Sequence, residues 1–374
     1  MNVRLMKCID AALGTIAAAC IPGPAKRAPS SPINSLLLIR PGGIGDAVLL
    51  APAIHTIKKT YPKVRITVLA ERRNAGVFAL IAGADRTFCY DSPREFIQAL
   101  RTRYDVVIDT EQWHRLSSVV ARLVQAAVKI GFDTNQRRRM FTDTVPYSQE
   151  DYEAISFIRL LEPLGIAASS TELEVPFLAV PDAASVKGAV LLEALGDQPF
   201  VTVFPGASVT ERRWGADRFR SVAEMLASRG VSSVVVGGEQ DRPQGDVIIT
   251  GGYGLNLAGL TSLSETAAII SKSRLLLSAD SGLLHIAVGL GVPTVSLFGP
   301  GRAKKWAPRG NNHSTINKEI ACSPCTTFGT TPSCPDNTRC MREISTDEIV
   351  AAVTTLLQRE QSRECVAEII TNSD

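Results

Sequence analysis

The sequence lacks any apolar run that could cross a bilayer, and it carries little net charge. No stretch reaches the ~20 consecutive apolar residues that a membrane-spanning helix requires. Lys and Arg number 40 against 37 Asp and Glu, a formal charge of +3, which argues against a dedicated nucleic-acid binder because such domains are strongly basic. With 45% hydrophobic and 21% charged residues in a chain of 374, the composition excludes a disordered or collagen-like protein and suits two or three globular domains.

The N-terminal 34 residues are predicted to form a short amphipathic segment and a linker. Residues 11–21 follow a basic start and are mostly apolar, in the outline of a signal peptide. Asp10 interrupts that outline, and residues 17–20 (Ala-Ala-Ala-Cys) lack the bulky apolar residue of a lipoprotein site. We therefore expect a helix lying on a membrane face, with an unstructured tail as the alternative. Its apolar positions are Leu5, Ile9, Leu13 and Ile16. Four prolines between residues 22 and 32 then form a stiff linker.

Four of the eight cysteines are closely spaced. They follow the pattern C-x2-C-x8-C-x5-C, which could hold a structural zinc ion, and they are Cys322, Cys325, Cys334 and Cys340. A pair of disulfides and free thiols are the alternatives. None of the three interpretations makes the cluster catalytic.

Short apolar runs alternate with helical periodicity twice along the chain. In the first half, strands are expected at residues 36–39, 66–69 and 106–108, with helices at 47–59, at 75–82 and from about 115. In the second half, strands are expected at 200–204, 231–236, 275–277 and 295–298, with helices at 216–228, 263–271 and 283–290.

This alternation predicts an α/β protein of two Rossmann-like, doubly wound domains facing across a cleft. Their expected ranges are residues 35–180 and 181–345. A C-terminal helix over 346–374 is expected to pack back on the first domain. In such sheets, ligands bind beyond the carboxyl ends of the strands.

The turn after the first predicted strand nearly matches a dinucleotide-binding fingerprint. Residues 43–48 are Gly-Ile-Gly-Asp-Ala-Val, and Glu71 follows the second strand, where a ribose-binding acid would lie. However, Val48 replaces the third glycine, and Asp46 brings a negative charge to the helix start, where a pyrophosphate would have to bind. Asp46 is therefore either a helix cap stabilised by the helix dipole or a carboxylate that accepts a proton from a hydroxyl group.

Three turns of the second half carry residue types that suit a nucleotide diphosphate. Residues 280–285 are Asp-Ser-Gly-Leu-Leu-His and begin a helix whose free N–H groups suit a phosphate. His285 could add a hydrogen bond or a positive charge, although a capping Asp with a surface His is the alternative. Residues 205–208 (Pro-Gly-Ala-Ser) precede Arg212, whose planar guanidinium can pair with two oxygens. After another strand, Asp241 could accept hydrogen bonds from ribose hydroxyls.

Together these turns form an ordered set of motifs. They are Arg-Pro-Gly-Gly-Ile-Gly-Asp at 40–46, Phe-Pro-Gly-Ala-Ser at 204–208, Asp-Ser-Gly-Leu-Leu-His at 280–285 and Phe-Gly-Pro at 298–300. From about residue 35 to residue 354 the sequence resembles glycosyltransferase family 9, the ADP-heptose:lipopolysaccharide heptosyltransferases. The resemblance implies the GT-B fold, with the acceptor on the N-terminal domain and the nucleotide sugar on the C-terminal one.

The resemblance also implies roles for individual residues. Asp46 corresponds to the family's proposed catalytic base, and Arg212 replaces a Lys that contacts donor phosphates in many members. The donor-binding residues are expected to be Ser208, Arg212, Asp241, Asp280, Ser281, Gly282 and His285. The acceptor-binding residues are expected to be Gly43, Gly45, Arg115 and Arg138, and further basic candidates for an anionic acceptor are Arg101, Arg103, Arg137 and Arg139.

The implied activity is an inverting transfer of heptose from ADP-heptose to the inner core of lipopolysaccharide. No D-x-D-type motif accompanies the donor residues, so we expect catalysis without a cofactor or divalent metal. The expected partners are the nucleotide sugar, the lipopolysaccharide core and a membrane face, with no nucleic acid. The expected location is cytoplasmic and peripheral on the inner membrane.

Other functions compatible with the sequence are a related GT-B transferase or epimerase acting on another nucleotide sugar, and a non-catalytic GT-B protein of envelope glycan assembly. An NAD-dependent dehydrogenase is the weakest alternative.

Overall fold

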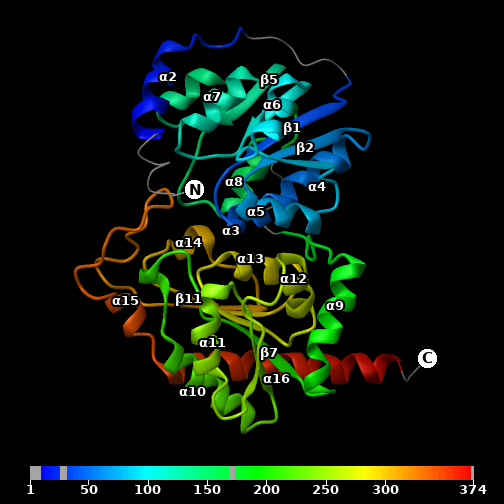
Figure 1. Ribbon diagram of the computed structural model, residues 1–374, viewed down its shortest axis with the longest axis vertical. Helices are drawn as coiled ribbons and strands as arrows, with labels where there is room; N and C mark the ends of the chain where they lie inside the picture. The colour runs from blue at the N-terminus through cyan, green and yellow to red at the C-terminus, as the bar shows by residue number, and fades with distance from the viewer. Residues whose placement is uncertain (1–9, 26–31, 168–172, 372–374) are drawn as a thin grey trace. The chain divides into compact units, whose positions relative to one another are not determined.

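The chain forms two units, Met1–Phe177 and Leu178–Asp374, in a computed structural model that describes residues 10–25, 32–167 and 173–371 (Figure 1). Each unit contains a complete parallel sheet of its own. The boundary lies within a few residues of the expected one at 180 and 181. The structure thus has the predicted two-domain α/β architecture.

The first unit is built on a six-stranded sheet in the order β3-β2-β1-β4-β5-β6. Its strands are β1 (Ser35–Arg40), β2 (Arg65–Ala70), β3 (Arg86–Cys89), β4 (Arg103–Asp109), β5 (Gln125–Phe132) and β6 (Asp143–Val145), and all neighbouring pairs are parallel. The central strand β1 is buried from Leu36 to Arg40, and its residues from Leu36 to Ile39 are apolar on both faces. The strand order reverses between β1 and β4, so the loops that follow these strands diverge and form a topological switch point.

Helices and 3₁₀ turns connect these strands. They are α3 (Ile44–Leu49), α4 (Ala51–Thr60), α5 (Arg72–Ala75), η2 (Gly76–Leu80), α6 (Pro93–Arg101), α7 (Leu116–Leu123), η3 (Asn135–Met140), α8 (Glu153–Arg159) and η4 (Glu162–Leu164). The helix expected over residues 47–59 is divided into α3 and α4, because Pro52 has no N–H to donate and its ring would collide with the carbonyl of the preceding turn. The helix expected over 75–82 is replaced by α5 and η2.

The N-terminal segment packs on the first unit. A π-helical turn, η1 (Asp10–Gly14), leads into α2 (Thr15–Cys20), which contacts α7 and η3 (Figure 1). The buried carboxylate of Asp10 accepts a hydrogen bond from the Leu116 N–H at 2.7 Å. Leu13 and Ile16 remain about 60% exposed, and the other two apolar positions, Leu5 and Ile9, lie outside the described residues. A short helix is present over this range, and its contact with a membrane face stays a prediction. No helix in the described ranges has the length and apolar character that spanning a bilayer demands.

The second unit repeats the strand order of the first. Its strands are β7 (Phe200–Phe204), β8 (Ser232–Val235), β9 (Gly254–Asn256), β10 (Leu276–Ala279), β11 (Thr294–Phe298) and β12 (His313–Asn317). They are arranged β9-β8-β7-β10-β11-β12, all parallel. The switch point therefore lies between β7 and β10, at the turns that the sequence motifs occupy.

The helices of the second unit close its core. They are α9 (Asp182–Leu192), η5 (Glu193–Leu195), η6 (Thr210–Arg212), α10 (Ala216–Ala227), η7 (Glu239–Asp241), α11 (Arg242–Ile248), α12 (Leu263–Ser271), α13 (Gly282–Gly289), α14 (Ala303–Trp306), α15 (Arg339–Arg342) and α16 (Thr346–Thr371). The packing of the C-terminal helix on the first domain stays a prediction. Ile349, Val353 and Leu356 of α16 belong to the apolar core of the second unit, where α16 contacts α10, β11 and β12.

Candidate functional site

Asp46 lies at the switch point of the first unit. Strand β1 ends at Arg40, the chain turns through Pro41, Gly42 and Gly43, and Asp46 stands in the first turn of α3. Gly42 adopts a φ of +103°, a conformation that favours glycine, and its N–H donates to Glu71 at 3.0 Å. The side chain of Asp46 is 23% exposed, so its carboxylate is accessible.

A buried arginine stands behind this carboxylate. The side chain of Arg40 is 1% exposed, with Nη2 3.9 Å from Oδ2 of Asp46 and 3.3 Å from Oε2 of Glu111. Its Nε donates to the carbonyl of Pro41 at 2.6 Å, and its Nη1 donates to the carbonyl of Thr110 at 2.9 Å. Burial lowers the pKa of Arg40, but Asp46 and Glu111 more than compensate, so the pKa is raised overall and the guanidinium stays charged.

Glu111 connects this ion pair to the loop after β4. Its Oε1 accepts hydrogen bonds from the N–H groups of Trp113 and His114, at 3.0 and 3.2 Å. Burial raises the pKa of Glu111, but Arg40 and the nearby His114 and Arg137 lower it overall. Glu111 is therefore an ionised carboxylate in the interior, compensated by cations and amides.

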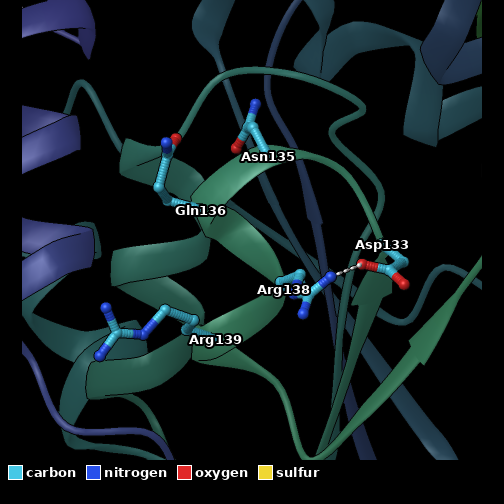
Figure 2. Close-up of a pocket in the computed structure, with 5 residues that line it drawn as sticks. All are labelled: Asp133, Asn135, Gln136, Arg138 and Arg139. Atoms are coloured by element: carbon cyan, nitrogen blue, oxygen red, sulfur yellow. Dashed lines mark ion pairs between the residues drawn. The ribbon is translucent and has the colours of Figure 1, made fainter.

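The arginines expected to bind an acceptor have different environments. Arg137 is fully buried, with Nη2 2.7 Å from Oδ2 of Asp109, so it is a structural ion pair and not a surface cation. Arg115 donates to Gln136 at 2.9 Å and its side chain is 16% exposed. Arg138 is exposed and lines a surface pocket on η3, where Figure 2 shows it directed toward Asp133 at 3.8 Å.

Other acceptor candidates lie apart from this end of the sheet. Arg101 and Arg103 lie where β4 begins, and Asp109 lies where it ends. Seven residues of extended strand separate the two ends by roughly 20 Å, so these two arginines do not belong to the site around Asp46. Arg139 is exposed beside Arg138 (Figure 2). Gly43 is the exposed N-cap residue of α3, and Gly45 is half-buried in its first turn.

The switch point of the second unit holds another ion pair, which is partly buried. Nη1 of Arg212, after β7, lies 3.0 Å from Oδ2 of Asp280, after β10. The backbone of Gly301 approaches the same carboxylate so closely that a Cβ there would lie 2.3 Å from Oδ2. The pair brings together two predicted donor-binding residues from turns nearly 70 positions apart in sequence, and it leaves the Arg212 Nε without a hydrogen-bond partner.

His285 is buried on α13 with its Nδ1 unpaired. Burial lowers its pKa to about 4, against a partial opposing effect of Asp280 and with a further lowering by Arg212. The imidazole is therefore neutral near pH 7. Of the two contributions expected from His285, only the hydrogen bond is available at this pH.

The start of α13 has the expected form. Ser281 is its N-cap residue, with Oγ accepting from the Leu284 N–H at 3.2 Å and 2.8 Å from the hydroxyl of Ser278. Gly282 is the first helical residue. Ser208 is exposed in the turn after β7. These backbone groups could hold an anion at the positive end of the helix dipole.

Asp241 has a structural environment that the sequence does not reveal. It is 2% exposed, and its Oδ2 accepts hydrogen bonds from the Gly238 N–H at 3.0 Å and from Gln240 at 3.3 Å. A Cβ on Gly206 would lie 2.4 Å from its Oδ1. The carboxylate thus ties the turn after β8 to the turn after β7, and a contact with ribose remains a prediction that this burial does not support.

The family model of glycosyltransferase family 9 (heptosyltransferase) matches residues 94–333. This match covers more than half of the chain and includes the donor-site turns of the second unit. The chain belongs to glycosyltransferase family 9.

Relatives and solved structures agree with this family 9 assignment. The chain is 27% identical over 293 residues to lipopolysaccharide heptosyltransferase 3 of Escherichia coli, covering 72% of this chain and 84% of that protein. Its fold is similar to a family 9 glycosyltransferase of Veillonella parvula, with a TM-score of 0.74, 20% identity, and coverage of 87% and 98%. It is also similar to E. coli ADP-heptose lps heptosyltransferase II, with a TM-score of 0.71, 20% identity, and coverage of 87% and 99%. The two-domain GT-B fold is therefore confirmed, and the protein is a glycosyltransferase.

Two site residues of this family 9 protein escaped the sequence analysis. Arg40 is inside the first motif but ends a strand, where an exposed cation would ordinarily be expected. Glu111 comes two residues after Asp109, where the buried strand β4 ends. This position was the available signal for a site residue, because the loops after the two strands at a switch point lie close together. The separation of 71 residues between Arg40 and Glu111 concealed their pairing.

The cysteine segment packs beside the family 9 donor turns. The N–H groups of Cys325 and Thr326 donate to the carbonyl of Pro300, at 3.1 and 2.9 Å. Every cysteine whose side chain is described is a free thiol, so the disulfide alternative finds no support within the cluster. Within the described ranges, no three His, Cys, Asp or Glu side chains come together as a metal-ligand set. The structural zinc ion stays a prediction without geometric support.

Proposed function

We propose that the protein transfers a heptose from ADP-heptose to a hydroxyl of the lipopolysaccharide inner core, with inversion at the anomeric carbon. Family 9 membership and the activities named for the similar E. coli proteins support this assignment. The observation that carries it is the accessible carboxylate of Asp46 at one switch point, combined with Arg212 and the α13 N-terminus at the other.

The donor diphosphate would bind at the turns after β7 and β10. Arg212 supplies the positive charge, and the N–H groups of Ser281 and Gly282 point out of the helix start. The neutral His285 contributes a hydrogen bond only. The diphosphate has to compete with Asp280 for the guanidinium of Arg212, since the carboxylate holds it at 3.0 Å. These preorganised donors would stabilise the charge that develops on the departing ADP.

Asp46 acts as the base in this scheme. The bond between the anomeric carbon and ADP breaks, the acceptor oxygen bonds to that carbon, and the acceptor proton moves to Asp46. A carboxylate next to the cation of Arg40 is stabilised as an anion. We therefore assign the proton transfer to a late stage, when the sugar has acquired oxocarbenium character and the acceptor oxygen is becoming positive.

The acceptor is anionic, and exposed cations of the first unit would attract it. Arg138 is a 66% exposed candidate at the η3 pocket, and Arg115 donates to Gln136, which lines the same pocket. Gly43 and Gly45 allow the acceptor to approach the α3 turn closely because they carry no side chain.

We also propose that α2 contacts an anionic lipid surface. The carboxylate of Asp10, in the preceding turn η1, accepts a hydrogen bond from the Leu116 N–H. This contact holds η1 and α2 on the unit, with Leu13 of η1 and Ile16 of α2 exposed. The adjoining η3 supplies the exposed cations Arg138 and Arg139. Apolar side chains flanked by cations suit the interface of an acidic bilayer. Because nucleotide sugars are made in the cytoplasm, we assign this contact to the cytoplasmic face of the inner membrane.

The test is a donor panel with mass detection of the product and of released ADP. We expect ADP release with ADP-heptose and a truncated core oligosaccharide, and equal rates with and without EDTA. Asp46→Ala should lower turnover by about 10² to 10⁴, the effect of removing a positioned base. Glu162→Ala, which removes an exposed carboxylate from the short helix η4, is the matched control and should retain the full rate.

Three results would contradict this assignment, and a fourth would contradict only the role of Asp46. Transfer from another nucleotide sugar but not from ADP-heptose would favour a different donor. Epimerised donor without transfer would indicate an epimerase. No turnover of any donor by folded protein would indicate a binding role. Full turnover by Asp46→Ala would remove Asp46 from the mechanism.

A further inference from the structure

The guanidinium of Arg40 contacts two carboxylates with different exposure. Its Nη2 lies 3.3 Å from Glu111, whose side chain is 8% exposed, and 3.9 Å from Asp46, whose side chain is 23% exposed. Asp46 is thus the partner that a substrate can reach. Removing the charge of either Arg40 or Glu111 therefore changes the electrostatic potential at Asp46.

Packing alone does not account for a cation at this position. Burying a guanidinium is unfavourable, and an apolar side chain of similar size can replace a buried ion pair without loss of stability. The aromatic ring of Phe157 lies 5.6 Å from the guanidinium carbon, so an apolar side chain would have a suitable neighbour. Glu153, which also faces this region, is already held by Gln112 and Tyr147.

We propose that Arg40 is the positioning residue of the base, holding the Asp46 carboxylate ionised and oriented, and that Glu111 limits how strongly it does so. This inference rests on the proposed function, in which Asp46 accepts the acceptor proton. The two residues come from the ends of β1 and β4, so the switch point itself brings the cation to the carboxylate.

Several other charged or titratable groups face this pair and contribute to the same field. They are Asp109 on β4, Glu153 on α8, Arg137 on η3, and His114 and Tyr147 in the loops. Arg137 pairs with Asp109, and Tyr147 donates to Glu153. Substituting Arg40 or Glu111 leaves both of these contacts in place, so the effects of the variants can be compared.

The experiment compares the pH dependence of kcat in Arg40→Met, Arg40→Lys and Glu111→Gln between pH 4 and 9. A carboxylate that loses a cation within about 4 Å takes up its proton at a pH higher by about one unit or more. Arg40→Met should therefore move the acid limb of kcat upward and lower kcat by about 10²-fold, with the KM for ADP-heptose unchanged. Arg40→Lys should restore part of both effects.

Glu111→Gln should move the acid limb in the opposite direction, to lower pH, because it removes a negative charge that competes for Arg40. The remaining amide oxygen can still accept from the N–H groups of Trp113 and His114. Opposite shifts of the acid limb in Arg40→Met and Glu111→Gln would indicate an effect on the charge of Asp46. A loss of structure in both variants would not move the limb in opposite directions. Arg159→Met, which removes a surface pair with Asp151 in the same unit, is the control and should leave the limb unchanged.

An acid limb that is the same in Arg40→Met and the unsubstituted protein would overturn the inference. If Arg40→Met does not fold, the double variant Arg40→Met/Glu111→Gln replaces it, because it removes both charges of the buried pair. The direction in which the acid limb of kcat moves is then tested by Glu111→Gln alone. An upward shift or no shift in Glu111→Gln also overturns it. Failure of the proposed function is a separate result, since unsubstituted protein would then release no ADP.

Discussion

The buried imidazole of His285 links the donor turns to the stability of the second unit. Its pKa is about 4 in the folded chain because burial disfavours the charged form, whereas an unfolded chain has a histidine pKa near 6.5. Between these pH values the unfolded state binds a proton that the folded state does not. The free energy of unfolding therefore falls as the pH decreases through this window.

We expect His285→Gln to reduce this acid sensitivity. From pH 7 to pH 4.5, the unsubstituted protein should lose about 2–3 kcal/mol more of its free energy of unfolding than the variant, at ~1.4 kcal/mol per unit of pKa displacement. Urea titrations at the two pH values measure this difference, and packing lost at both values cancels. Equal losses in the two proteins would show that His285 is not kept neutral by the fold.

Residue types could be predicted at the site, but their burial could not. Asp46, Arg212 and His285 stand at strand ends, as the motifs predict. Asp241 carries the expected carboxylate, but that side chain is enclosed by backbone. Arg137 belongs to a basic run, which usually indicates a solvated surface, but it is buried against Asp109. Whether a charge points inward depends on partners far away in sequence, and a single chain does not display those pairs.

At the scale of elements, the strands at and beside the two switch points were predictable, whereas the edge strands and the interior strand β5 were not. β1, β7 and β11 are almost fully buried and mostly apolar, and they were expected within one or two residues of their observed bounds. β9 and β12 are only partly buried and contain polar residues, so they lack the run that marks a strand buried on both faces. The division of α3 from α4 depended on Pro52, whose presence in the helical stretch was the available signal.

The turns after β7 and β8 should be energetically coupled, because Gly206 in the first turn lies against Asp241 in the second. Gly206→Ala introduces a Cβ 2.4 Å from Oδ1 of Asp241, and we expect a loss of about 1–3 kcal/mol in the free energy of unfolding. Asp241→Ala removes the obstructing oxygen together with its hydrogen bond to Gly238. The double variant should therefore lose less free energy of unfolding than the sum of the two single effects. The remaining cost comes from Phe204, whose Cε2 lies 2.8 Å from the same Cβ position. Additive losses, measured by urea unfolding, would contradict this coupling.

At the scale of the whole molecule, the proposed membrane contact predicts a surface-specific response to charge. We expect co-sedimentation with vesicles that contain phosphatidylglycerol, weaker with phosphatidylcholine alone and weaker as salt increases. Leu13→Glu/Ile16→Glu should reduce binding by about tenfold or more, because each side chain inserts apolar area.

The matched control for that test lies on the other unit. Val186 and Val190 on α9 are also exposed, at 66% and 57%, and Val186→Glu/Val190→Glu should leave vesicle binding unchanged. Equal binding by both double variants and the unsubstituted protein would exclude α2 as the contact.

The two sheets are built from consecutive parts of the chain, and this has a consequence for folding during synthesis. In the described chain, every strand of the first sheet precedes Phe177, and no later strand joins it, so this half can complete its hydrogen bonding while the ribosome is still translating the rest. The second half differs, since Ile349, Val353 and Leu356 of α16 complete its core. Its folding has to wait until the codons for α16 have been translated, and until then its exposed apolar surface is prone to aggregate and needs binding by chaperones.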